Sequence, residues 1–94
     1  ELELLNIVIA KDFQAMSYGH YFIKYLVEYA QKKLFTAIFL EVRESNYNAI
    51  KLYQNFAFEK VGLRKNYYSI PTNNHQKAYE NALIMRLSLI SQLK

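Results

Sequence analysis

The chain of 94 residues is long enough for one domain only. Hydrophobic residues make up 52% of it and charged residues 21%, with two glycines and one proline, which is typical of a folded globular protein. Cysteine is absent, so disulfides, a thiolate metal site and a cysteine nucleophile are excluded. The net charge of +4 comes from cations scattered along the chain, which favours a solvated surface over a nucleic-acid-binding one.

No apolar run approaches the roughly 20 residues of a membrane span, and no signal-like segment opens the chain. We therefore expect a cytoplasmic protein without a membrane partner. The first residue is Glu1 rather than Met, which indicates a chain that begins inside a longer reading frame.

The first half of the chain alternates between strand and helix patterns. A nearly continuous apolar run over residues 2–10 predicts a buried strand, central in its sheet. Apolar residues recur at three- and four-residue spacing over 17–33, which predicts an amphipathic helix. The β-branched and aromatic run over 36–42 predicts a second strand.

The second half begins with a short helix, for which Ser45 or Asn46 offers an N-cap. Residues 58–63 predict a strand, 68–79 a loop, and 81–89 a last strand that can pair with 58–63. The predicted fold is therefore α/β, in the order strand, helix, strand, helix, strand, strand. Strand–helix–strand units favour a parallel start, and an antiparallel final pair gives a mixed sheet.

The turn into the first helix is a candidate seat for a phosphate group. A helix that begins directly after a buried strand presents unpaired N–H groups and the positive end of its dipole. The turn reads Gln14-Ala15-Met16-Ser17-Tyr18-Gly19 and contains one glycine. From these residues alone, an ordinary strand-to-helix turn is the simpler interpretation.

The same turn resembles that of the GNAT N-acetyltransferases, whose Gln/Arg-x-x-Gly-x-Gly/Ala signature cradles the pyrophosphate of CoA. Gln14 and Gly19 match its first and last positions, while Ser17 stands where the first glycine is expected. If that position requires a positive φ, a serine there costs roughly 1 kcal/mol. If φ is ordinary, the hydroxyl can donate to a phosphate, and both alternatives remain open.

A longer resemblance runs through residues 38–68. The runs Leu-Glu-Val-Arg-x-Ser-Asn at 40–46, Ala-Ile-x-Leu-Tyr at 49–53 and Arg-x-Asn-Tyr-Tyr at 64–68 are similar to motifs of one GNAT family, the ribosomal-protein alanine N-acetyltransferases. They occur in that family's order and spacing. The resemblance implies that residues 1–94 are a single partial N-acetyltransferase domain, which lacks the family's N-terminal strands and helices.

The resemblance also implies an activity, the transfer of acetyl from acetyl-CoA to a protein N-terminal amine. The expected acceptor is the N-terminal alanine of a small-subunit ribosomal protein. Such a transfer uses a base and an acid, and the resemblance assigns these roles to Glu41 and Tyr53. From the residues alone, the better interpretation of Glu41 is an edge-strand carboxylate paired with Arg43 or a lysine, and that of Tyr53 is a core aromatic.

The remaining site residues are implied by the same resemblance, which requires acetyl-CoA and no metal. The residues expected to contact CoA are Ile7, Val8, Ile9, Gln14, Ala15, Met16, Ser17, Tyr18, Gly19, His20 and Asn46. The residues expected to line the groove of the peptide substrate are Asn66, Tyr67 and Tyr68. Exposed tyrosines also follow from a composition rich in Lys, Asn, Ile and Tyr, so this second set has an alternative explanation.

Three departures from the family pattern keep other readings open. Ser17 is one, the absent N-terminal part is another, and Ala57 replaces the glycine that normally ends the second helix. In a left-handed conformation an alanine costs about 1 kcal/mol relative to glycine. A non-catalytic remnant, or an enzyme for another amine such as a polyamine or lysine, is the alternative. The missing cover is expected to expose apolar sheet surface and to favour a homodimer.

Overall fold

The computed structural model describes residues 4–8, 16–73 and 76–89, with the side chains from residue 19 onward. The elements are β1 (Leu4–Val8), α1 (Met16–Lys32), β2 (Ala37–Arg43), α2 (Tyr47–Asn55), β3 (Glu59–Ile70) and β4 (Ala78–Ser88). The predicted order of strands and helices is confirmed. β3 is longer than predicted, because it continues through residues expected to form a loop. No helix in the part of the chain described is long and apolar enough to cross a membrane.

The four strands form one mixed sheet in the order β1-β2-β4-β3. β1 pairs with β2 in parallel, and β4 runs antiparallel to both β2 and β3, as predicted for the final pair. Within the described sheet β1 lies at an edge, whereas we expected the first strand to be central. A continuous apolar run indicates that both faces of a strand are buried, but it does not determine how many strands flank it.

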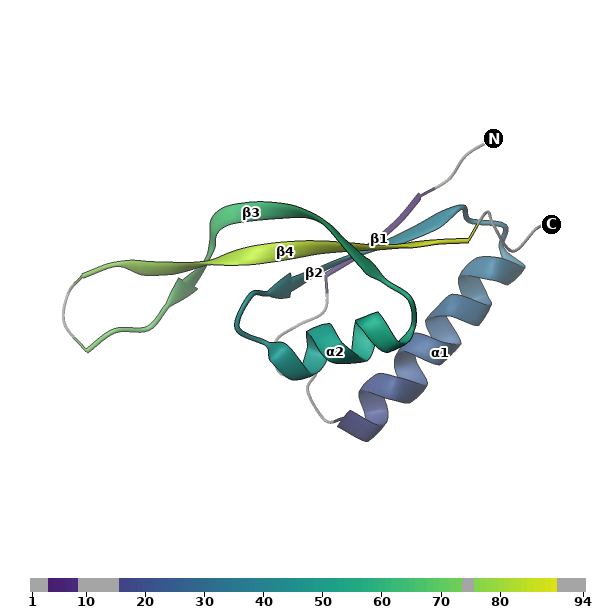
Figure 1. Cartoon of the computed structure of the whole chain (residues 1–94), viewed down its shortest axis with the longest axis horizontal. Helices are drawn as coiled ribbons and strands as arrows, with labels where there is room; N and C mark the ends of the chain where they lie inside the picture. Colours follow the sequence, from purple (N-terminus) through teal and green to yellow (C-terminus); the bar gives the residue numbers. More distant parts are fainter. Residues whose placement is uncertain (1–3, 9–15, 74–75, 90–94) are drawn as a thin grey trace.

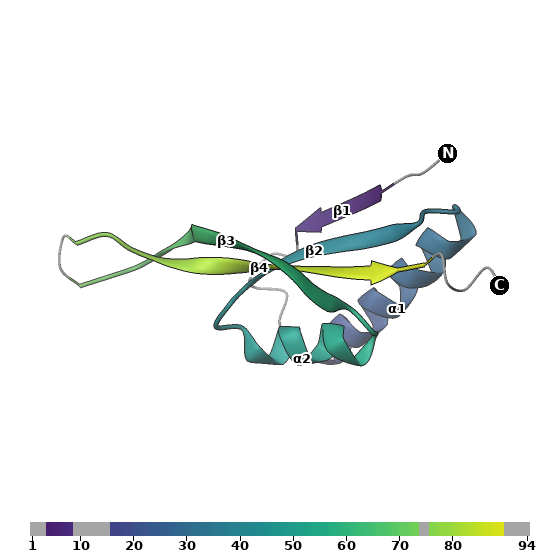
Figure 2. The same cartoon turned by 45° about the horizontal axis from the view of Figure 1, so that its top comes forward.

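Both helices pack on the same face of the sheet, as Figures 1 and 2 show. Alternate residues of the two inner strands point toward them, because successive side chains of a strand face opposite ways. The core on this face is formed by Ile23, Leu26 and Ala30 of α1, Ile38, Leu40 and Val42 of β2, Tyr53 of α2, and Leu83, Met85 and Leu87 of β4. These buried contacts hold α2, and with it Tyr53, against the sheet.

The opposite face of the sheet carries the other set of alternating side chains. On β2 these are Phe39, Glu41 and Arg43, which are only partly exposed. The register places Arg86 of β4 beside Phe39, with its guanidinium carbon 5.9 Å from the ring centroid. In the described residues this face is therefore mixed, with charged groups between the apolar ones, rather than the apolar surface that we expected.

The C-terminus of α2 ends on a left-handed alanine. Ala57 has a φ of 73°, as the comparison with the family's glycine anticipated. Its N–H donates to the Gln54 carbonyl at 2.9 Å, and the Phe58 N–H donates to the Tyr53 carbonyl at 3.0 Å. These two bonds form a Schellman cap. Beside it, the ring centroids of Phe58 and Tyr53 lie 5.9 Å apart.

Replacing Ala57 by Gly should stabilise the chain by about 1 kcal/mol, because glycine adopts this conformation without a steric penalty. Urea unfolding followed by circular dichroism would measure the change. Ala49→Gly, inside α2, is the matched control and should destabilise by a similar amount, since glycine is a poor helix former. A loss of stability in Ala57→Gly would contradict the assigned strain.

Candidate active site

Glu41 lies on β2, on the face of the sheet opposite the helices. Its side chain is 13% exposed, and its Oε2 atom is 2.6 Å from Nε of Arg64 on β3. β2 has neighbours on both sides, and Arg43 pairs instead with Glu80. The edge-strand interpretation is therefore wrong, because β2 lies between β1 and β4. The partner of Glu41 is Arg64 of β3, rather than Arg43 or a lysine.

A bulge in β3 determines which way Arg64 points. Lys60 pairs with Met85 and Gly62 with Ile84, so Val61 is an extra residue without a partner on β4. One extra residue reverses the facing of every later side chain in a strand. Without it, Arg64 would point toward the helices, and with it Arg64 shares the face of Glu41.

Tyr53 lies in the core on the helix-covered face and is 2% exposed. Burial, and secondarily the neighbouring Tyr68, raises the pKa of Tyr53 to about 12. The core-aromatic interpretation is confirmed. The acid role stays a prediction, and the high pKa favours a phenol that donates a hydrogen bond to a thiolate over one that ionises freely.

Arg43 forms a second polar group two residues further along β2. Its Nη1 atom lies 3.0 Å from Oε1 of Glu80, and its guanidinium carbon lies 4.3 Å from the ring centroid of Tyr68. Oε2 of Glu80 accepts a hydrogen bond from the Ser45 N–H at 3.0 Å. Hydrogen bonds from Ser45 and Arg43 lower the pKa of the Glu80 carboxyl, so the pair is ionic at neutral pH.

Tyr68 interacts electrostatically with both candidate catalytic residues, Glu41 and Tyr53. Burial, followed by the negative charge of Glu41, raises the pKa of Tyr68. Because Tyr68 in turn raises the pKa of Tyr53, its phenol is close enough to both residues to feel or exert a charge effect. Glu41 and Tyr53 themselves lie on opposite faces of the sheet, so Tyr68 is the residue that interacts electrostatically with both.

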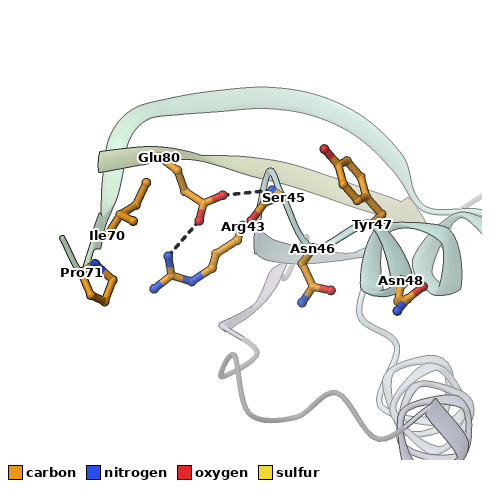
Figure 3. Close-up of a pocket in the computed structure, with 8 residues that line it drawn as sticks. All are labelled: Arg43, Ser45, Asn46, Tyr47, Asn48, Ile70, Pro71 and Glu80. Atoms are coloured by element: carbon orange, nitrogen blue, oxygen red, sulfur yellow. Dashed lines mark hydrogen bonds and ion pairs between the residues drawn. The ribbon is translucent and has the colours of Figure 1, made fainter. Parts of the chain in front are cut away.

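A groove opens where β2 ends and the chain turns into α2 (Figure 3). Its volume is about 480 Å³, and its lining combines charged, amide and apolar side chains. The lining residues are Arg43, Ser45, Asn46, Tyr47, Asn48, Ile70, Pro71 and Glu80. The Arg43–Glu80 pair forms one wall, so the groove adjoins the polar face that carries Glu41.

The three predicted substrate residues lie on the β3 side of the hairpin, not in the groove lining. Asn66 has a φ of 54°, and its N–H donates to Oδ1 of Asn81 at 3.0 Å. Tyr67 is 45% exposed, lies 5.2 Å from the Arg64 guanidinium carbon and meets Tyr68 edge to face at 5.0 Å. Their contact with a substrate stays a prediction.

The predicted CoA-contacting residues that the structure describes lie in β1, at the start of α1 and at Asn46. Ile7 and Val8 lie in β1 and pair with Leu40 and Glu41. Met16, Ser17, Tyr18, Gly19 and His20 form the first turn and a half of α1. Ser17 therefore has a helical backbone, which excludes a strained positive φ and leaves the alternative of a hydroxyl donor. Ile9, Gln14 and Ala15 lie outside the described residues.

Gly19 also allows α1 and α2 to pack closely, a role separate from the phosphate-binding signature. It is buried where α1 crosses α2, and a Cβ atom at this position would lie 2.9 Å from Cδ2 of Leu52. The next residue, His20, is exposed and rests its ring against Phe56 at 5.1 Å. The entry of α1 is thus fixed by contacts to α2, whatever it binds.

Asn46 is the N-cap of α2, as predicted from the sequence. Its Oδ1 atom accepts a hydrogen bond from the Ala49 N–H at 3.2 Å, and its carbonyl accepts one from the Ile50 N–H at 3.0 Å. Among the described residues, no group of three His, Asp or Glu side chains is arranged to hold a metal ion.

Sequence reasoning missed Arg64, Arg43 and Glu80 as members of the site. The motif at 64–68 was recognised, but its arginine had no assigned partner. Pairing Arg64 with Glu41 requires the register of β3 on β4, including the bulge at Val61. An opposite-charge search among strand residues would have proposed these pairs, without choosing between them.

The sequence profile of the acetyltransferase (GNAT) family matches residues 1–58, and the chain belongs to this family. The [ribosomal protein bS18]-alanine N-acetyltransferase of Haemophilus ducreyi is 37% identical over 89 residues, which are 95% of this chain and 59% of that protein. The protein of the same name from Escherichia coli (strain K12) is 35% identical over 89 residues, or 95% and 57%. The chain thus spans somewhat more than half the length of these curated relatives.

Solved structures bear out the predicted GNAT-like fold. The crystal structure of the ribosomal-protein-S18-alanine N-acetyltransferase from Escherichia coli matches with a TM-score of 0.68 and 30% identity, over 89% of this chain and 54% of that one. A GNAT family acetyltransferase from Elizabethkingia anophelis, with acetyl-CoA bound, has a TM-score of 0.72 at 20% identity, over 95% and 63%. The second likeness concerns the fold alone.

Proposed function

We propose that the protein containing this chain transfers acetyl from acetyl-CoA to a protein N-terminal amine, with the N-terminal alanine of ribosomal protein bS18 as the first acceptor to test. The observation that carries the proposal is the place of Glu41. It pairs with Val8, the last residue of β1, at the carboxyl ends of two parallel strands. Ligands of α/β folds bind beyond such strand ends, where the following helix presents its N-terminus.

The chemistry assigns one proton to each candidate residue. The amine nitrogen attacks the carbonyl carbon of the thioester, and the carbon–sulfur bond breaks as the amide forms. The Glu41 carboxylate accepts the proton that the nitrogen loses, directly or through water. The Tyr53 phenol donates a hydrogen bond to the departing thiolate, which takes its proton from the phenol or from solvent, so CoA leaves as a neutral thiol.

The groove beside Arg43 supports a polypeptide acceptor over a small amine. A volume of about 480 Å³ is more than a single amine needs. The amides of Asn46 and Asn48 and the apolar Ile70 and Pro71 suit the mixed backbone and side-chain surface of an extended peptide. We assign to this groove the residues that follow the acetylated one, with Asn66, Tyr67 and Tyr68 on the hairpin beside it.

Calorimetric titration of acetyl-CoA into the chain, and into the complete reading frame that encodes it, tests the proposal. We expect binding, followed by acetylation of a peptide that begins with the N-terminal alanine of bS18. The same peptide with a blocked N-terminus and an internal lysine is the control, and a polyamine tests the alternative acceptor. Absence of acetyl-CoA binding in both proteins would contradict the proposal.

The alternative function is a CoA-binding remnant without turnover. The left-handed Ala57 favours it, since the strain lies at the end of the helix that carries Tyr53. Binding of acetyl-CoA without transfer to any of these amines would support the remnant. A cytoplasmic location and a homodimer stay predictions, and size-exclusion chromatography of the complete reading frame tests the second.

A further inference from the structure

We propose that Arg64 is a positioning residue for acetyl transfer, which holds the Glu41 carboxylate in one orientation on the open face of the sheet. This inference rests on the proposed function and adds a residue to which neither the family pattern nor the relatives' names assign a role. Arg64 acts through Glu41 and is not itself expected to touch the substrate.

The contact is short and comes from a strand that is not adjacent. Nε of Arg64 lies 2.6 Å from Oε2 of Glu41, and the side chain of Glu41 is only 13% exposed. β4 separates the two strands, so their backbones are roughly 9–10 Å apart. A guanidinium can cross that distance, and its rigid planar set of N–H groups fixes the geometry of a carboxylate contact more closely than the freely rotating ammonium of lysine does.

The fold leaves a path for this bridge. Ala82 of β4 lies opposite Arg64 on one side and Arg43 on the other, and it is completely buried. Glu41 lies opposite Ile84 of β4, so the Arg64 side chain crosses β4 diagonally, and the methyl group of Ala82 leaves room for it to do so. The bulge at Val61 supplies the second condition, because it turns Arg64 to this face.

Two further contacts keep the pairing specific. Arg43, on the same face, is already engaged by Glu80 at 3.0 Å and stacks on Tyr68, so it does not compete for Glu41. The ring of Tyr67 lies 5.2 Å from the guanidinium carbon of Arg64 and limits where the group can move.

The consequence for catalysis is orientation. Because Oε2 faces Arg64, Oε1 is the oxygen that remains for an amine or a water molecule. A base held in one geometry reacts faster than one that samples several, and a small misplacement can cost on the order of 100-fold. Loss of Arg64 should therefore lower kcat and leave the KM for acetyl-CoA nearly unchanged.

The first test detects the pair itself, without activity. In ¹⁵N-labelled protein, the guanidinium protons of Arg64 should exchange with water more slowly than those of Arg86, because the ion pair with Glu41 restricts them. Arg86 lies on the same face of the sheet, opposite Phe39 of β2 and Glu59 of β3, and among the described residues it forms no ion pair. The difference should disappear in Glu41→Gln, whose neutral amide binds the guanidinium weakly. Equal exchange for both arginines in the unaltered protein would overturn the inference.

The second test compares acetylation of the Ala-starting peptide by Arg64→Met, Arg64→Lys and the matched control Arg86→Met. We expect kcat to fall on the order of 10- to 100-fold in Arg64→Met, with partial recovery in Arg64→Lys and no change in Arg86→Met. The KM for acetyl-CoA should stay within about twofold in all three, which a general loss of structure would not allow.

The outcomes separate this inference from the function on which it rests. No turnover by the unaltered complete protein would overturn the proposed function, and the inference with it. Turnover that Arg64→Met leaves unchanged, or lowers no more than Arg86→Met does, would overturn the inference alone. Ala82→Leu provides an independent check, because it obstructs the path of Arg64 without changing any charge, and it should reproduce the loss in kcat.

Discussion

Replacing Glu41 by Gln should lower kcat for acetyl transfer by about 100-fold or more, because the amide has the shape of the carboxylate but cannot accept a proton. Affinity for acetyl-CoA should change little, since the residue is assigned to the amine and not to the cofactor. Initial rates measured by mass spectrometry of the peptide product, together with calorimetry for acetyl-CoA, separate the two effects.

Glu44→Gln is the matched control for this change. Glu44 follows β2 three residues after Glu41, is exposed, and accepts a hydrogen bond from Nδ2 of Asn81 at 3.2 Å. The same loss of charge there should leave the rate within about twofold. If Glu41→Gln retains full activity, Glu41 is not the base, and a water molecule or another group takes the proton.

The chain should lose stability steeply above pH 10, and Tyr53 should account for a distinct part of the loss. Burial raises the pKa of Tyr53 to about 12 in the folded state, whereas the unfolded chain has the ordinary value of about 10. The unfolded state therefore releases its proton first as pH rises. The contribution of Tyr53 to the free energy of unfolding, on the order of 3 kcal/mol, is fully present below about pH 10 and disappears between about pH 10 and 12.

Urea unfolding at pH 7 and at steps up to pH 11.5 would measure this loss. Tyr53→Phe should remove the part due to Tyr53 and flatten the curve, while Tyr21→Phe, at a site that is 69% exposed, should leave it unchanged. Tyr68 still titrates in both variants, so the difference between the curves isolates Tyr53. Identical alkaline curves for the unaltered chain and Tyr53→Phe would contradict the buried phenol.

The same variant tests the acid role. Tyr53→Phe should lower kcat by about 100-fold if the phenol protonates the thiolate, while its stability at pH 7 should change by only about 1 kcal/mol. Full activity in Tyr53→Phe would leave Tyr53 as a core residue alone.

Local patterns in the sequence were sufficient to predict the order of strands and helices. Apolar spacing over 17–33 predicts α1, and the run over 36–42 predicts β2, because the 3.6-residue and two-residue periods are written directly into the chain. The cap by Asn46 and the left-handed Ala57 are equally local, since each depends on the residues of one helix end. The motif at 40–46 likewise identified Glu41 before any partner was known.

The tertiary structure alone determined the partners of these residues. The insertion of β4 between β2 and β3, and the single extra residue Val61, place Arg64 on the face of Glu41. Strand order and register are long-range properties, and a one-residue shift reverses which side chains meet. No local period in the sequence records that shift. The candidate base could therefore be named from the sequence, and the arginine that holds it only from the fold.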